Sequence, residues 1–162
     1  MISYIFQDFK SVSAGFRCLI SVNKVGKINI WIRLMFFLYG KRNRAIKLLG
    51  GVCHNHILKT YSSEISPGCK IGKGILFPHP IGIVIGSGCE LHDNLVIYQN
   101  VTLGKAKNGY PCLENNVTVF PNSSIIGPII IAENTTIGAN SVVLKSTESN
   151  SVYAGCPAKR IK

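Results

Sequence analysis

The chain is 162 residues long, and its 18 Lys and Arg against 7 Asp and Glu give a formal net charge of +11. Hydrophobic residues make up 46% of it and charged residues only 15%, so it can bury a core and does not have the composition of a disordered tail. The first residues do not read as a secretory signal, and the most apolar stretch, 28–39, contains Arg33 and is shorter than the roughly 20 residues of a spanning helix. We therefore expect a cytoplasmic protein, either free or lying against the inner face of the cytoplasmic membrane.

Residues 1–60 are expected to form a basic helical segment. Apolar residues recur at steps of three and four over 5–20, which is typical of an amphipathic helix. Two further helices are expected over 28–39 and 43–58. Ten Lys and Arg against a single Asp give this segment a net charge of +9, which favours contact with something anionic.

The sequence leaves open what the basic segment contacts. Its aromatic side chains lie beside its cations: Trp31, Phe36, Phe37 and Tyr39, with Arg33, Lys41, Arg42 and Arg44. This mixture suits an anionic membrane surface, and it suits equally well a helical cap folded onto the rest of the chain. A nucleic-acid partner is not expected, because no helix-turn-helix, RNP or zinc-finger pattern is present.

From residue 61 onward the large apolar residues follow a period of six. Thirteen residues keep this spacing and are called here the ruler residues: Ile65, Ile71, Phe77, Ile85, Leu91, Ile97, Leu103, Leu113, Val119, Ile125, Ile131, Ile137 and Val143. Steps of eight and ten, after Phe77 and Leu103, mark insertions of two and four residues. A short strand plus a turn accounts for six residues, and three such sides close one coil of about 18. Residues 61–162 therefore predict an all-β repeat of about four to five stacked coils.

The six cysteines do not indicate a metal site or a disulfide framework. They include no C-x-x-C pair and no Cys/His cluster at zinc spacing. Cys69 and Cys89 both stand four positions after an inward residue of the repeat, which favours a role as small core fillers. We expect reduced thiols and no metal.

Three segments depart from the repeat: 76–82, where two prolines flank His79, the insertion between 103 and 113, and the ending 153–160. Together with intact parts of the repeat they resemble the serine acetyltransferase-like branch of the hexapeptide acyltransferases. The resemblance rests on Glu64-Ile-Ser-Pro67, Ile71-Gly-Lys-Gly74, Pro78-His-Pro-Ile-Gly82, Val101-Thr-Leu-Gly104, Ile137-Gly-Ala-Asn-Ser-Val-Val143 and Ala154-Gly-Cys-Pro-Ala-Lys159. It covers 61–162 and implies a left-handed parallel β-helix, acetyl-CoA as co-substrate, and a homotrimer with its active site between neighbouring columns.

The resemblance also implies roles for single residues. His79 would be the general base that deprotonates an acceptor hydroxyl, and Glu64, at the family's Asp position, would orient the imidazole. The residues implied for acetyl-CoA are small ones along the pantetheine arm and cations at its phosphates: Gly104, Gly138, Ala139, Lys145, Lys159 and Arg160. One coil departs from the family, because Val119-Phe-Pro-Asn122 stands where the family has Ile-Gly-Ala-Gly.

The acceptor is predicted from the insertion. Gly109-Tyr110-Pro111 stands where serine acetyltransferases carry Arg-His-Pro, whose histidine helps hold the amino acid. Burying an unpaired amine or carboxylate is costly, so we expect a sugar of a surface polysaccharide, or its lipid- or nucleotide-linked precursor, with Tyr110 holding it. A serine O-acetyltransferase of cysteine biosynthesis is the alternative, and a non-catalytic β-helix scaffold is a further one.

A zinc hydratase on the same type of helix, as in the γ-class carbonic anhydrases, is not expected. Such a site needs three histidines around one metal, and only His79 and His92 lie in the repeat.

Overall fold

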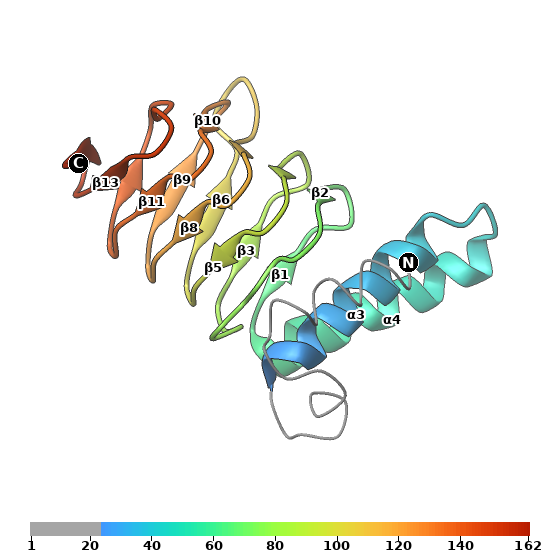
Figure 1. Cartoon of the computed structure of the whole chain (residues 1–162). Coiled ribbons are helices and arrows are strands. Elements are labelled where there is room, and N and C mark those ends of the chain that lie inside the picture. The colour runs from blue at the N-terminus through green and yellow to red at the C-terminus, as the bar shows by residue number, and fades with distance from the viewer. Residues whose placement is uncertain (1–23) are drawn as a thin grey trace.

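The computed structural model describes residues 24–162, which form a pair of helices followed by a column of short strands (Figure 1). Helices α3 (Lys24–Tyr39) and α4 (Arg44–Tyr61) correspond to the two helices expected over 28–39 and 43–58. The amphipathic helix expected over 5–20 lies outside the described residues.

The strands of the column fall into three sheets. Sheet A contains β1 (Glu64–Ile65), β3 (Val84–Ile85), β6 (Thr102–Gly104), β9 (Ser124–Ile126) and β12 (Val142–Val143). Sheet B contains β2 (Lys70–Ile71), β4 (Glu90–Leu91), β7 (Cys112–Leu113) and β10 (Ile130–Ile131). Sheet C contains β5 (Val96–Ile97), β8 (Thr118–Val119), β11 (Thr136–Ile137), β13 (Val152–Ala154) and β14 (Lys159–Arg160). Neighbouring strands are parallel except β13 and β14, which form an antiparallel pair at the end of the chain.

The chain visits sheets A, B and C in turn, so each circuit is one coil of a parallel β-helix with four complete coils and an incomplete fifth. Twelve of the thirteen ruler residues are buried and Ile71 is half-buried, which confirms that the period of six lists the inward positions. The registers Glu64↔Val84 and Thr102↔Ser124 show that the first and third coils are the long ones. The two insertions therefore leave the strand pairing intact and project from corners.

Asparagines form ladders along two of the three corners. Asn94, Asn116, Asn134 and Asn150 have positive φ, as do Asn100, Asn122 and Asn140. Asparagine tolerates this left-handed conformation because its short side chain can hydrogen-bond locally. Each side-chain amide donates to the next asparagine oxygen along the ladder, over 2.9–3.4 Å. The corners thus stack as regularly as the strands.

The helical pair covers the open first coil of the column (Figure 1). Ile28, Ile32 and Met35 of α3 are buried in the same core as the coil residues. The Asn29 amide donates to the Ile75 carbonyl at 2.8 Å, and the Arg33 guanidinium donates to the carbonyls of Ile71 (3.2 Å) and Gly72 (2.5 Å). Because the coil at either end of a β-helix leaves backbone groups without a neighbouring strand, these buried polar side chains supply the missing partners for the first coil.

The cap interpretation of the basic segment therefore holds for α3, and Arg33, 8% exposed, faces the column rather than a membrane. Lys41, Arg42 and Arg44 are exposed at the far turn. Of the helices that the structure describes, none is both long and apolar enough to cross a membrane.

Candidate active site

His79 is exposed on the corner between sheets C and A, called here the CA corner. Its carbonyl accepts from the Ile81 amide at 2.8 Å, which makes a tight turn between the flanking prolines. The buried Ser63 hydroxyl donates to the Pro80 carbonyl (3.3 Å) and accepts from the Ile83 amide (3.1 Å). The two-residue insertion is thus fastened to the start of the column, with the imidazole outside it.

Glu64 lies next to this turn, as the first residue of β1, and its side chain is exposed. Its amide donates to the Ile83 carbonyl at 2.8 Å, so its backbone is fixed beside the insertion. Within the described residues no hydrogen bond or ion pair joins Glu64 to His79. The structure brings the two residues into one neighbourhood without pairing their side chains.

Aromatic rings continue the CA corner away from His79. The His79 and Tyr98 ring centroids are 6.3 Å apart at 47°, and the Tyr98 and Phe120 rings stack at 5.1 Å and 7°. Tyr98 and Phe120 each follow the inward residue of a paired strand, β5 and β8. The residues that directly follow the inward positions Ile97 and Val119 could have predicted this stack. From the sequence alone, Phe120 stood out only as a departure from the family pattern.

Small residues follow the aromatic stack along the same corner. Gly138 comes directly after β11, and a Cβ on it would lie 2.9 Å from that of Ala154. Ala139 follows, and Lys159 of β14 is the antiparallel partner of Ala154. The CA corner therefore brings together four of the predicted residues in order along the column: His79, Gly138, Ala139 and Lys159.

Three further predicted residues lie across sheet A, on the corner between sheets A and B, called here the AB corner. Gly104 ends β6, and Lys145 lies two residues after β12. Tyr110 belongs to the four-residue insertion, and its ring covers Gly86 and Gly88, where an added Cβ would lie 2.5 and 2.2 Å from ring carbons. Within one chain the structure does not bring these residues to His79.

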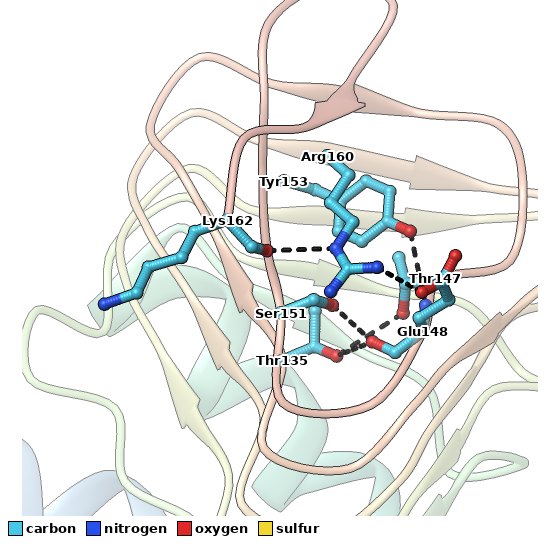
Figure 2. A network of polar contacts seen from close by, with 7 residues as sticks. All are labelled: Thr135, Thr147, Glu148, Ser151, Tyr153, Arg160 and Lys162. Atoms are coloured by element: carbon cyan, nitrogen blue, oxygen red, sulfur yellow. Dashed lines mark hydrogen bonds and ion pairs between the residues drawn. The ribbon is translucent and has the colours of Figure 1, made fainter.

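Arg160 is engaged within its own chain (Figure 2). Its guanidinium forms an ion pair with Glu148 and donates from Nε to the Lys162 carbonyl at 3.2 Å. The Glu148 carbonyl accepts from Thr135 and Ser151, which orders this loop against β13. Lys145 and Lys159 are exposed, and no ion pair is formed by either among residues 24–162. Of the three predicted cations, Lys145 and Lys159 are therefore the two that remain available to an anionic ligand.

The buried thiols do not contribute a nucleophile. Burial raises the pKa of Cys69 to about 12 and that of Cys89 to about 11. A thiol with so high a pKa carries almost no thiolate at neutral pH. Both side chains are in the core, which confirms their prediction as fillers.

The column matches known hexapeptide transferases. Residues 113–145 match the family described as "Bacterial transferase hexapeptide (six repeats)". A serine acetyltransferase of Staphylococcus epidermidis is 45% identical over 104 residues, which cover 61% of this chain and 48% of that enzyme. One from Staphylococcus aureus is 43% identical over 103 residues, with the same coverage. The chain thus matches about half the length of these relatives.

The fold agrees with solved structures over almost its whole length. Serine acetyltransferase of Brucella abortus, in complex with coenzyme A, has a TM-score of 0.88 and 25% identity, covering 99% of this chain and 67% of that one. A left-handed β-helix, as the resemblance implied, is thereby confirmed.

These comparisons show that the predicted sugar acceptor is wrong. The relatives at 43–45% identity and the structural neighbours are serine acetyltransferases, which favours the alternative reading over a polysaccharide enzyme. Tyr110 does not hold an acceptor in this structure, because its ring packs on its own chain and its hydroxyl accepts from Ser87 at 3.2 Å. A residue used for packing on the AB corner does not decide the acceptor.

The period of six, the three-sheet column and the match of its later coils agree with one another. The β-helix of this chain is thus similar to the bacterial hexapeptide transferases over its later coils and to serine acetyltransferases over most of the column.

Proposed function

We propose that the chain is an acetyl-CoA-dependent O-acetyltransferase whose acceptor is L-serine. The observation that carries the proposal is its 43–45% identity to serine acetyltransferases over 103–104 residues. A serine acetyltransferase solved with coenzyme A shares this fold across the chain, which supports acetyl-CoA as the donor.

In this reaction His79 acts as the general base. The serine hydroxyl attacks the thioester carbonyl of acetyl-CoA, its proton passes to the imidazole, and the new C–O bond replaces the C–S bond. The proton then goes to the departing CoA thiolate, which leaves the free thiol and O-acetylserine. Because the imidazole of His79 is exposed and its backbone is held between two prolines, it is accessible to both substrates and fixed in place.

Glu64 assists by stabilising the imidazolium. It lies beside the His79 turn but makes no direct bond to it, so its contribution is electrostatic or depends on a shift of either side chain when substrates bind. A carboxylate near a general base favours the protonated base that forms during transfer.

Acetyl-CoA lies along the CA corner. His79 and Ala139 are three coils apart, roughly 14 Å at the usual spacing of parallel strands. The arm would pass Gly138 and Ala139, where little side chain intervenes, and then the Tyr98–Phe120 stack. Lys159 stands at the far end for a phosphate, whereas Arg160 would have to leave Glu148 to take part.

The active form is a homotrimer with its site between neighbouring columns. His79 and Glu64 lie at one edge of sheet A, and Gly104 and Lys145 at the other, so only a second column can bring the two sets together. Exposed apolar side chains at these edges, Ile81, Val84 and Leu144, would be buried by such packing. Sedimentation equilibrium should give three chains per particle, and a stable, active monomer would contradict this.

The activity is tested by thiol release from acetyl-CoA in the presence of L-serine. Wild-type protein should turn over, and His79→Ala should lose a factor on the order of 10² to 10⁴ while still binding acetyl-CoA. His56→Ala, which removes an imidazole from α4 instead, is the matched control and should keep full turnover. Near-normal turnover by His79→Ala would reassign the base, and no turnover of serine by the wild type would overturn the proposed function.

A cytoplasmic location and a contact between residues 1–60 and an anionic membrane stay predictions. Exposed apolar side chains of α4, Leu48, Leu49 and Val52, lie near Arg44 and Lys47, which suits an anionic bilayer. Sedimentation with vesicles of anionic lipid, and with neutral vesicles as the control, tests this contact.

A further inference from the structure

Three metal-binding side chains gather on the outer face of sheet B, away from the CA corner. They are Glu90, His92 and Cys112, and their ligand atoms all lie within 4.8 Å of one another. The sequence spacing hides this cluster, because Cys112 is 20 residues from His92 and joins it only through the stacking of coils. The expectation of no metal rested on spacing along the chain.

The backbone holds these side chains in one place. Glu90 is the first residue of β4 and His92 directly follows that strand, so both point outward while Leu91 between them points into the core. Cys112 of β7 is the direct neighbour of Glu90 in the parallel register. The His92 amide donates to the Leu113 carbonyl at 2.9 Å, which extends the pairing past His92. The three ligand side chains therefore lie on two adjacent coils, and the strand pairing fixes the distance between these coils.

The donor atoms have a spacing suited to a tetrahedral transition metal. The Cys112 sulfur and the His92 Nε2 are 3.7 Å apart. Zinc bonds of about 2.3 Å to sulfur and 2.0 Å to nitrogen, at a tetrahedral angle, place the two atoms about 3.5 Å apart. Thiolate, imidazole and carboxylate are all zinc ligands, and a hard cation such as Mg²⁺ would not select a sulfur.

The charges around the cluster also bear on cation binding. Burial raises the pKa of the Cys112 thiol, and the Glu90 and Glu114 carboxylates raise it further. Glu90 already has a cationic partner, because the Lys70 ammonium lies 2.5 Å from its Oε1. Lys70 is thus a built-in competitor for one of the three ligands.

We propose that Glu90, His92 and Cys112 bind a divalent transition metal of the zinc class, with a fourth position open to water. Binding is reversible and competes with the Lys70–Glu90 ion pair. The site is on a different sheet from His79, and binding at it requires no acetyl transfer.

The test uses Co²⁺ as a spectroscopic stand-in for zinc on the reduced full-length chain. Wild-type protein should show a sulfur-to-cobalt charge-transfer band that saturates at one ion per chain, and excess Zn²⁺ should abolish it. Cys112→Ser should lose the band, and His92→Ala should weaken binding. Cys156→Ser, which removes an exposed thiol elsewhere, is the matched control and should keep the band.

Lys70→Met adds a second readout, because it frees Glu90 without touching a ligand. Cobalt binding should become tighter in this variant, and the gain should disappear when Glu90→Gln is added. No charge-transfer band in the wild type, or a full band in Cys112→Ser, would overturn the proposal. These titrations measure binding alone, so they stand or fall independently of serine turnover.

Discussion

The column and the helical pair are stabilised in different ways. In the column each coil repeats the one before it, so the inward aliphatic side chains of successive coils stack into one core. In the helical pair, α3 buries Ile28, Ile32 and Met35 against the first coil, while α4 leaves Leu48, Leu49 and Val52 in solvent. The column makes its own core, and the pair shares in that core at one end.

This difference shows how a repeat protein ends. A stack of coils can grow by adding identical coils, but the coil at each end exposes backbone groups and apolar surface. Here α3 covers the first coil with an apolar face and two buried polar side chains, Asn29 and Arg33. The far end is closed differently, by β14 folding back on β13. A cap therefore needs both apolar contact and hydrogen-bond donors.

The strongest test of this comparison replaces a column residue. Ile97 is fully buried in β5, so Ile97→Ala should lower the free energy of unfolding by about 2–5 kcal/mol, from lost burial and the cavity left behind. Urea denaturation followed by circular dichroism measures it.

The matched control is Leu49→Ala on α4, where the side chain is 56% exposed. Its effect should stay within about 0.5 kcal/mol. Equal losses of unfolding free energy in the two variants would show that α4 is buried in an assembly and stabilises the protein as much as the column core does.

A second test concerns the junction. Arg33→Met keeps most of the apolar stem but leaves the carbonyls of Ile71 and Gly72 without these donors, which should cost about 1–3 kcal/mol of unfolding free energy. Arg33→Lys should recover part of this, since one ammonium can serve one carbonyl. If both variants unfold like wild type, the apolar contacts of α3 alone account for the cap.

The smallest expected effect is at a corner of the column. Asn116 has φ of 60° and links Asn94 to Asn134 in the ladder. Asn116→Ala should cost about 1–2 kcal/mol because alanine resists the left-handed conformation. Asn116→Gly should cost less, since glycine accepts that conformation and loses only the ladder bonds. Glycine as costly as alanine would show that the hydrogen bonds, and not the backbone, hold the corner.

Much of the column could be predicted from sequence because its contacts repeat at a fixed interval. The thirteen ruler residues, the core roles of Cys69 and Cys89, and the places of both insertions all follow from one period. The helices were also expected, but their role was not, since an apolar and basic helix suits a membrane as well as a protein surface. The contacts of α3 with the first coil, including those of Asn29 with Ile75 and of Arg33 with Ile71 and Gly72, separate the two.

The sequence by itself determined the stacked coils, because a period of six places one inward side chain on each side of a coil. The left hand of the helix followed from the family resemblance and not from the spacing. It also determined that His79 lies on a corner, since two prolines and an insertion cannot continue a strand. The tertiary structure decided which residues lie together across coils. It placed Tyr110 on Gly86 and Gly88 and paired Arg160 with Glu148. It also brought Cys112 to His92. The strand register places residues about one coil apart next to each other, and no short sequence motif contains both members of such a pair.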